Sequence, residues 1–414
     1  MAVLHPVHKS IALTPKYVER FRCIGPDCED NCCTGWRVSI DKKTYNAYRK
    51  IEYPEISKRL ENNIKRTRAN QTQDAYARIE LKPEDLQCPM MEERLCAIQK
   101  HLGEDKLSNT CFSYPRHTVK FKGNYEQSMT LSCPEAARLA LLSADAFDFV
   151  QSPVYLRPEM DKVISARHGL SNEDVHAVRV FSLQLMRTQG LEIWQKLAVL
   201  GIFCEQLDAL LKQDPAANVA QLVENVKEMV GRGLVADALR DLSPDYEVQA
   251  TAFAALWGRK HLEDGQATLQ KEVQRAIAAG LGAQSGENTV NRPLLVSQYK
   301  KGVQQLPQAL SAAPWLLENY LLNEMFREFF PFGSDDTVYA HYIRLVTRFG
   351  LVRLMMAAQC TTNDTLPGVE TLVRTVQVFS RRYQHDGHFA KDVTGALKNS
   401  GWDSLQHIFR FLKT

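Results

Sequence analysis

Ten cysteines are the residues of this chain whose type and spacing point most directly to chemistry. Eight of them lie within the first 133 residues, where an even distribution would place about three. Four fall in the stretch FRCIGPDCEDNCCTGW, residues 21–36. The eight clustered cysteines are Cys23, Cys28, Cys32, Cys33, Cys88, Cys96, Cys111 and Cys133. This clustering predicts a site at which several thiols act together.

Clustered thiols in a reducing compartment are typical of metal ligands or redox groups rather than disulfides. The N-terminal sequence MAVLHPVHKSIALTP has no basic region followed by an apolar one, so we expect no signal peptide and a cytoplasmic location. A thiolate is a soft donor that binds zinc or iron strongly. Eight thiolates therefore predict two closed metal sites, or one site with auxiliary thiols.

The first four of these cysteines are spaced C-x4-C-x3-C-C. After a long gap, the last four follow one another with 7, 14 and 21 residues between them. Gly25, Pro26 and Gly35 suit a loop that folds tightly around a metal. Neighbouring side chains usually diverge, so Cys32 and Cys33 fit a larger cluster, or two different centres, better than one zinc ion. The pairs of C-x2-C that are typical of zinc are absent, which favours a [4Fe–4S] cluster, with zinc as the alternative.

The elements that must position these thiols change in character along the chain. Residues 1–150 suggest an irregular Cys-rich metal-binding domain, with short helices and brief strands in WRVSI and HTVKFKG. From about residue 135 the pattern becomes helical, and Ser171 is a candidate N-cap of one helix. We therefore predict a mainly α protein, in which residues 151–414 form an all-α helical bundle or array. Beyond two helices in 171–213, further helices are expected at 217–231, 246–262, 265–280, 313–330, 335–359, 367–382 and 402–412.

Composition excludes two classes of partner. The formal charge is +3, from 51 Lys and Arg against 48 Asp and Glu, which argues against a protein that neutralises many phosphates of a nucleic acid. No apolar run approaches the roughly 20 residues that span a bilayer. Cys204 and Cys360 lie in apolar helical stretches and are expected to be small buried hydrophobes.

The cysteine blocks resemble those of the flagellin lysine-N-methylase family. The resemblance rests on FRCIGPDCEDNCCTGW, on CPMMEERLCAIQKHLGEDKLSNTCFSYPRH and on LSCPEAAR. The first two are also similar to a broader CxxCxxCC group that chelates zinc or iron. The helical block NYLLNEMFREFFPFG is similar to the C-terminal region of the methylases, so the resemblance covers most of the chain.

The resemblance implies a cytoplasmic bacterial enzyme that moves methyl groups from S-adenosylmethionine to surface lysines of flagellin. It also implies an iron–sulfur cluster, with the eight clustered cysteines as the matching metal positions; which four of them share a centre is left open. Tyr114 and Arg116, beside Cys111, and Trp36, beside Cys33, are candidates for lining the S-adenosylmethionine pocket, or else they simply pack around the metal. The catalytic residue is not identified by the sequence. The alternative function is a non-enzymatic zinc or iron module, such as a metal chaperone, whose helical domain docks a partner.

Overall fold

The computed structural model describes residues 4–36, 38–69, 71–157, 162–164, 170–213, 218–258, 268–283, 291–333, 337–384 and 386–414. The chain divides into two compact units. The first, which we call the Cys-rich unit, comprises residues 1–139, 148–163 and 262–274. The second, the helical unit, comprises residues 140–147, 164–261 and 275–414. All eight clustered cysteines belong to the Cys-rich unit.

A five-stranded sheet with the order β10-β7-β8-β1-β9 forms one part of the Cys-rich unit. Its strands are β1 (His8–Pro15), β7 (Arg116–Phe121), β8 (Asn124–Met129), β9 (Phe149–Leu156) and β10 (Lys162–Ile164). The first strand pairs antiparallel with β9, with Ala12 opposite Ser152, and parallel with β8. Because residues alternate between the two faces, Ala12, Val154 and Leu156 pack together on one side. The N-terminal region is therefore more regular than expected.

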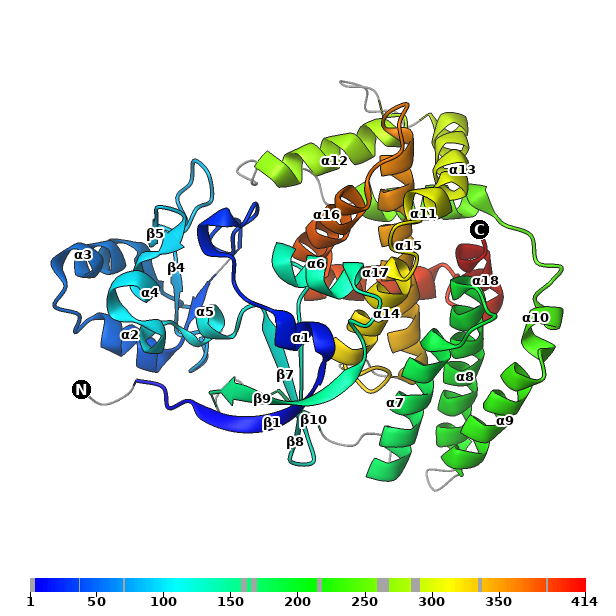
Figure 1. Cartoon of the computed structure of the whole chain (residues 1–414), viewed down its shortest axis with the longest axis horizontal. Helices are drawn as coiled ribbons and strands as arrows, with labels where there is room; N and C mark the ends of the chain where they lie inside the picture. Colours follow the sequence, from blue (N-terminus) through cyan, green and yellow to red (C-terminus); the bar gives the residue numbers. More distant parts are fainter. Residues whose placement is uncertain are drawn as a thin grey trace. The chain divides into compact units, whose positions relative to one another are not determined.

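A smaller sheet and its helices surround the cysteines. The strands β2 (Ser39–Ile40), β4 (Ala77–Ile79) and β3 (Ile64–Arg66) lie in that order, and α2 (Lys42–Tyr48) and α3 (Pro54–Asn63) lie beside them (Figure 1). The predicted brief strands in WRVSI and HTVKFKG correspond to β2 and β7. The remaining elements of the Cys-rich unit are α1 (Lys16–Arg20), η1 (Gly25–Asp27), β5 (Met91–Glu92), β6 (Leu95–Cys96), α4 (Ala97–Leu102), η2 (Glu104–Lys106), α5 (Asn109–Ser113) and most of α6 (Pro134–Leu142).

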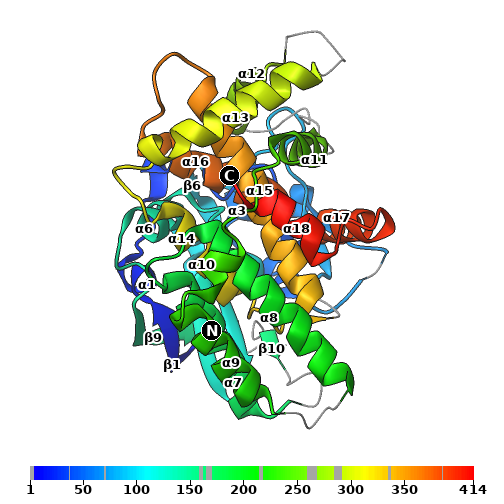
Figure 2. The same ribbon diagram turned by 90° about the vertical axis from the view of Figure 1, so that its right-hand side faces the viewer.

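The helical unit is an array of helices, which confirms the predicted fold class. Its helices are α7 (Asn172–Arg187), α8 (Ile193–Gln213), α9 (Val219–Gly231), α10 (Leu234–Ala238), α11 (Tyr246–Gly258), α13 (Arg292–Ala309), α14 (Leu316–Arg327), α15 (Val338–Thr361), α16 (Val369–Phe379), α17 (Gly387–Asn399) and α18 (Leu405–Leu412). The helix α12 (Thr268–Gly280) has its first residues, up to Gln274, in the Cys-rich unit and the rest in the helical unit. Ser171 caps α7 as predicted, by accepting a hydrogen bond from the amide of Asp174 at 3.0 Å. Figures 1 and 2 show α7, α8 and α9 side by side.

The long helix α15 lies at the centre of this array. It is buried from Tyr342 to Cys360 almost without interruption. Its backbone is approached closely by α13, because a Cβ added at Gly302 would stand 2.1 Å from the carbonyl oxygen of Ala357. Nearly all of α14 is buried as well. The sequence did not predict α10, α13 or α17.

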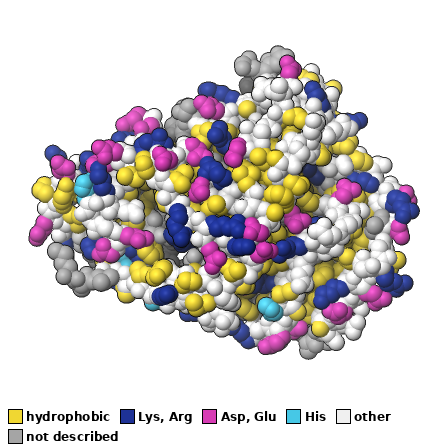
Figure 3. All heavy atoms as spheres, viewed as in Figure 1, with side chains coloured by type: hydrophobic (Ala, Val, Ile, Leu, Met, Phe, Trp, Pro, Cys, Tyr) yellow, Lys and Arg dark blue, Asp and Glu magenta, His cyan; other side chains and the backbone are white. Residues whose placement is uncertain are grey.

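The surface carries charges of both signs. On the face shown in Figure 3, basic and acidic side chains are interspersed. None of the helices in the described part of the chain has the length and apolar character needed to cross a membrane.

Candidate functional site

The loop that carries the first four cysteines is tied to a distant segment by backbone hydrogen bonds. Gly25 and Gly35 both have positive φ angles, +58° and +75°, which glycine adopts without the steric cost of a Cβ. The amide of Gly35 donates to the carbonyl of Leu86 at 2.9 Å. The amide of Cys88 donates to the carbonyl of Cys33 at 2.6 Å. Cys33 and Cys88, 55 positions apart in the sequence, are thus neighbours.

The hairpin of β5 and β6 brings a third thiol to the same place. Met91 pairs with Cys96 across the hairpin, and the amide of Met91 donates to the carbonyl of Cys88 at 2.9 Å. The two residues at the turn, Glu93 and Arg94, have φ values of +49° and +63°. The hairpin thereby places Cys96 beside Cys88.

The short helix α5 supplies a fourth thiol. Ser108 caps this helix by accepting a hydrogen bond from the amide of Cys111 at 3.3 Å. The hydroxyl of Thr110 donates to the carbonyl of Ser39 at 3.1 Å, which fixes α5 against β2. Cys88 is part of the hydrophobic core beneath the small sheet, and three further thiols pack against that core, those of Cys33, Cys96 and Cys111.

The other clustered cysteines lie around the start of α6. Cys133 is buried and directly precedes that helix. Arg138 of α6 forms an ion pair with Glu29 at 2.7 Å, which holds the helix to the residue after Cys28. Cys23 and Cys32 are exposed.

Burial disfavours the charged thiolate when no metal is bound. It raises the pKa of Cys28 and Cys88 to about 11 and that of Cys111 and Cys133 to about 12. A metal cation supplies the opposite charge that favours the thiolate, so the donor set suits a metal that displaces the protons on binding.

All ten cysteines lie in the described part of the chain and are free thiols. Among the described residues, no three His, Cys, Asp or Glu side chains stand close enough together to hold a single metal ion. A zinc ion gathers its sulfurs at about 2.3 Å. An iron–sulfur cluster is larger than a single ion and holds its thiolates farther apart. The distances between the described side chains therefore argue against a site for a single metal ion. The eight clustered thiols lie in one unit, and four of them belong to or pack against one hydrophobic core.

The structure brings two of the three predicted pocket residues together. The rings of Trp36 and Tyr114 lie 5.4 Å apart between centroids. The indole of Trp36 donates to the carbonyl of Cys32 at 2.5 Å, and the hydroxyl of Tyr114 is 3.2 Å from that of Ser132. The exposed Arg116 instead lies with its guanidinium 5.8 Å from the ring centroid of Phe21. Trp36 and Tyr114 thus form an aromatic pair beside the cysteine loop.

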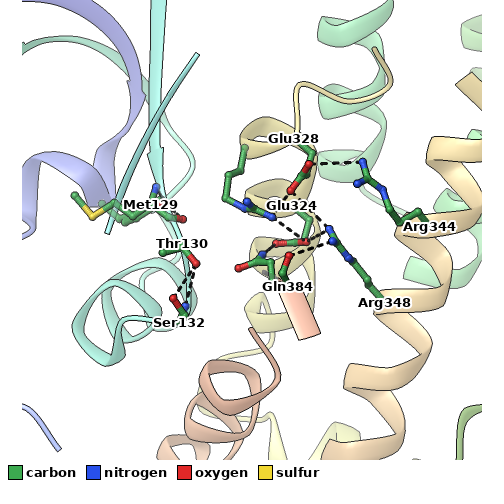
Figure 4. A network of polar contacts seen from close by, with 10 residues as sticks. Met129, Thr130, Ser132, Glu324, Glu328, Arg344, Arg348 and Gln384 are labelled. Carbon is green, nitrogen blue, oxygen red and sulfur yellow. Dashed lines mark hydrogen bonds and ion pairs between the residues drawn. The ribbon is translucent and has the colours of Figure 1, made fainter. Parts of the chain in front are cut away.

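The helical unit contains a buried group of charged residues that the sequence analysis did not single out. Figure 4 shows Glu324 and Glu328 facing Arg344 and Arg348 of α15. We call this group the ion cluster; its members are Glu324, Arg327, Glu328, Arg344 and Arg348. The guanidinium of Arg348 is 3.1 Å from Glu324 and 3.7 Å from Glu328, and that of Arg344 is 3.6 Å from Glu328.

The ion cluster also holds a π-helical turn, Ser380–Gln384. The side-chain amide of Gln384 donates to Glu324, and Arg348 donates to the carbonyl of Gln384 at 3.5 Å. Tyr320 is fully buried one turn before Glu324, and its hydroxyl has no hydrogen-bond partner among the described residues. The alternation of Glu324, Arg327 and Glu328 at helical spacing was the available sequence signal, and it was obscured by the apolar residues around it.

Comparison with known sequences identifies the family. The sequence model of the FliB lysine N-methylase C-terminal domain matches residues 179–411, more than half of the chain. The chain belongs to the FliB lysine N-methylase family. The match spans nearly all of the helical unit from α7 onward, including the ion cluster.

Relatives extend the similarity to the Cys-rich unit. The Lysine-N-methylase of Salmonella typhimurium is 26% identical over 394 residues, which cover 93% of this chain and 94% of that protein. The Lysine-N-methylase of Salmonella choleraesuis matches equally, at 26% over 394 residues. The Flagellar biosynthetic protein FliU of Salmonella muenchen is 36% identical over 140 residues, 33% of this chain and 82% of that protein. No solved structure matches the chain. The resemblance seen in the cysteine blocks is thereby confirmed, and the names of these relatives support methyl transfer to lysine.

Proposed function

We propose that this protein transfers methyl groups from S-adenosylmethionine to the ε-amines of surface lysines on flagellin, in the cytoplasm. The observation that carries the proposal is the similarity to lysine-N-methylases over 93% of the chain. The name of the flagellar relative supports a flagellar substrate. The full coverage argues against a bare metal carrier, since both units are shared with the methylases.

The reaction sets two demands on the protein. A free lysine amine has a pKa of about 10.4 and must lose its proton before it attacks the sulfonium methyl group. The enzyme must also hold the nitrogen and the methyl carbon in contact and in line. The positive sulfonium favours an aromatic surface, because the face of a ring attracts a cation. The paired rings of Trp36 and Tyr114 offer such a surface, and we assign them to the methyl donor, with Arg116 as a candidate for its carboxylate.

Four of the eight clustered cysteines would hold a [4Fe–4S] cluster in the Cys-rich unit, with zinc as the alternative. When bound, the cluster supplies cross-links between chain segments that are far apart in the sequence, and so it orders the loop that carries Trp36. Cys33, Cys88, Cys96 and Cys111 serve this role through their position on one hydrophobic core.

The cellular test uses a strain that lacks this protein. Mass spectrometry of its flagellin should show every modified lysine without methyl groups, and a plasmid copy should restore them. A copy with Trp36→Ala should restore fewer methyl groups than one with Trp36→Phe. Flagellin that keeps its methyl groups in the deletion strain would contradict the proposal and leave a metal module that docks a partner as the better description.

A further inference from the structure

We propose that the hydroxyl of Tyr114 accepts a hydrogen bond from the amine of the substrate lysine, and that this contact favours the first two methyl transfers over the third. The proposed function assigns the ring of Tyr114 to the methyl donor and gives its hydroxyl no role. This inference rests on the proposed function and deepens it, because it assigns a group to the lysine and sets how many methyl groups are added rapidly.

The aromatic pair offers one side-chain acceptor to a substrate. The indole of Trp36 carries a donor and no hydrogen-bond acceptor, and its donor is already turned to the carbonyl of Cys32 at 2.5 Å. The phenol of Tyr114 both donates and accepts. Trp36 and Tyr114 are each only half-buried, so a second molecule can reach them. Of the two rings, that of Tyr114 is therefore the one that can accept an N–H.

Two buried hydroxyls stand behind the phenol. The hydroxyl of Tyr114 lies 3.2 Å from that of Ser132, which in turn lies 3.0 Å from that of Thr130 (Figure 4). Ser132 is 2% exposed and Thr130 is 6% exposed. In both contacts either oxygen can be the donor. Tyr114 can thus donate its own hydrogen inward to Ser132 and use a lone pair of its oxygen for an N–H that comes from outside.

The backbone holds the phenol in place. The amide of Tyr114 donates to the carbonyl of Thr110 at 3.3 Å, at the end of α5. The amide of Thr130 donates to the carbonyl of Pro115 at 2.9 Å, which joins the end of β8 to the residue after Tyr114. The ring is also paired with that of Trp36. An acceptor fixed in this way can orient a bound amine, and such orientation lowers the barrier to a transfer between two bound molecules.

The transfer itself needs a neutral amine with a free lone pair. An N–H that is bonded to Tyr114 holds the nitrogen so that its lone pair can face the methyl group of the donor. A bond then forms between this nitrogen and the methyl carbon as the carbon–sulfur bond breaks. The sulfur keeps the electron pair and becomes a neutral thioether. The nitrogen becomes a methylated ammonium, which loses a proton to water before the next transfer.

The supply of N–H groups decides which transfers Tyr114 assists. A neutral lysine amine has two N–H bonds, a monomethylated amine has one, and a dimethylated amine has none. Tyr114 can therefore bind the substrates of the first and second transfers and finds no hydrogen to accept in the third. We expect the first two transfers to be fast and the third to be slow.

The experiment measures the three transfers separately. The full chain, purified without oxygen, is incubated with S-adenosylmethionine and with flagellin that carries unmethylated, monomethylated or dimethylated lysine, and mass spectrometry gives each rate. Tyr114→Phe keeps the ring, so the KM for S-adenosylmethionine should stay unchanged. The first and second rates should fall roughly tenfold, the effect of one lost hydrogen bond, and the slow third rate should not change. The matched control is Tyr48→Phe, which removes a hydroxyl that donates to the carbonyl of Lys106 at 2.8 Å in the same unit, and all three rates should be kept.

Three results would overturn the assignment. The first is a Tyr114→Phe variant whose first transfer is as fast as that of the unaltered protein. The second is an equal fall in all three rates, which indicates a structural role for the hydroxyl. The third is an unaltered protein that methylates dimethyllysine as fast as lysine; this measurement needs no variant, so it decides the question even if Tyr114→Phe fails to fold. Each of these results leaves methyl transfer to flagellin intact, whereas a protein that transfers no methyl group at all would contradict the proposed function and this inference with it.

Discussion

At the scale of single residues, the account depends on Trp36 and Tyr114. Their rings lie 5.4 Å apart beside the loop that carries four of the thiols. Each ring is also anchored by a polar contact. Trp36 donates to the carbonyl of Cys32, and the hydroxyl of Tyr114 contacts that of Ser132, the residue before Cys133. An aromatic pair that is anchored in this way can present a fixed surface to a cation.

Replacing Trp36 tests this surface. We expect Trp36→Ala to raise the KM for S-adenosylmethionine about fivefold, as the loss of one cation–π contact of ~1 kcal/mol predicts, and Trp36→Phe to keep most of the affinity. The matched control is Tyr76→Ala, which breaks the Tyr45–Tyr76 ring pair of the same unit, whose centroids are 5.3 Å apart. Iron content measured beside KM separates donor binding from loss of the cluster. An unchanged KM in Trp36→Ala would remove Trp36 from the donor site.

At the scale of elements, the ion cluster fixes α14 against α15. Glu324 is 1% exposed and pairs with Arg348 at 3.1 Å. Removing one member of a buried ion pair leaves the other uncompensated, so Glu324→Gln should lower the free energy of unfolding by about 3 kcal/mol. The exposed pair of Glu228 and Arg232, at 3.3 Å, is the control, and Glu228→Gln should change stability little. Urea denaturation measures both; equal effects would contradict a stabilising role for the cluster.

The same cluster predicts a dependence on pH. Burial alone would raise the pKa of Glu328, but Arg327, Arg348 and Arg344 outweigh it and hold the pKa well below the usual range. Because the folded-state pKa is lower than the unfolded value of about 4.3, the ionised carboxylate stabilises the fold above that value and loses its effect as the pH falls further. Glu328→Gln should therefore be less stable than the unaltered protein at neutral pH, and the gap should close in acid. A gap that stays constant across an acid titration of urea midpoints would contradict this.

Close helix packing gives a further prediction. A Cβ at Gly302 of α13 would meet the carbonyl oxygen of Ala357 at 2.1 Å, so Gly302→Ala should force the helices apart and lower the melting temperature by several degrees. Gly395 of α17 has no atom within 4 Å of such a Cβ, and Gly395→Ala should be neutral or stabilising. Thermal unfolding of the two variants measures the difference. Equal melting temperatures would show that α13 does not pack on α15 in this way.

The elements that the sequence predicted are those with strong local signals. Ser171 marks the start of α7, and the helix expected at 313–330 contains α14. The helix α13 was missed because Pro293 and Pro307 lie within it and weaken the pattern. The strands β1 and β9 were missed because their pairing joins Ala12 to Ser152, and no local pattern specifies such a distant partner.

The candidate site also has features that the sequence predicts and features that only the fold shows. The clustering of cysteines is visible in the sequence, since short spacing alone places Cys23 to Cys33 in one loop. Which thiols share a centre is not visible, because it depends on contacts such as the one between Cys33 and Cys88. The ion cluster was missed because Glu324 and Arg348 are brought together only by the packing of two helices.

At the scale of the whole molecule, the two units should respond differently to loss of metal. The clustered thiols all lie in the Cys-rich unit, whose elements are short, whereas the helical unit has an extensive apolar core of its own. Chelation of the full chain should lower the melting temperature of the Cys-rich unit. The unfolding of the helical unit, followed by circular dichroism, should be unchanged. Trp36 is the only tryptophan in the sequence of the Cys-rich unit. Subtracting the fluorescence of Trp36→Phe from that of the unaltered protein therefore gives the signal of Trp36, which reports the unfolding of that unit. A shift of both transitions together would contradict independent stabilisation.

The central claim is that this chain moves a methyl group from S-adenosylmethionine to a lysine of flagellin. The most direct measurement incubates the metal-loaded protein with purified unmethylated flagellin and S-adenosylmethionine labelled in its methyl group. The account predicts label on lysine side chains of flagellin, less label with Trp36→Ala, and none without the enzyme. Flagellin that remains unlabelled, with protein that is folded and fully loaded with metal, would contradict it.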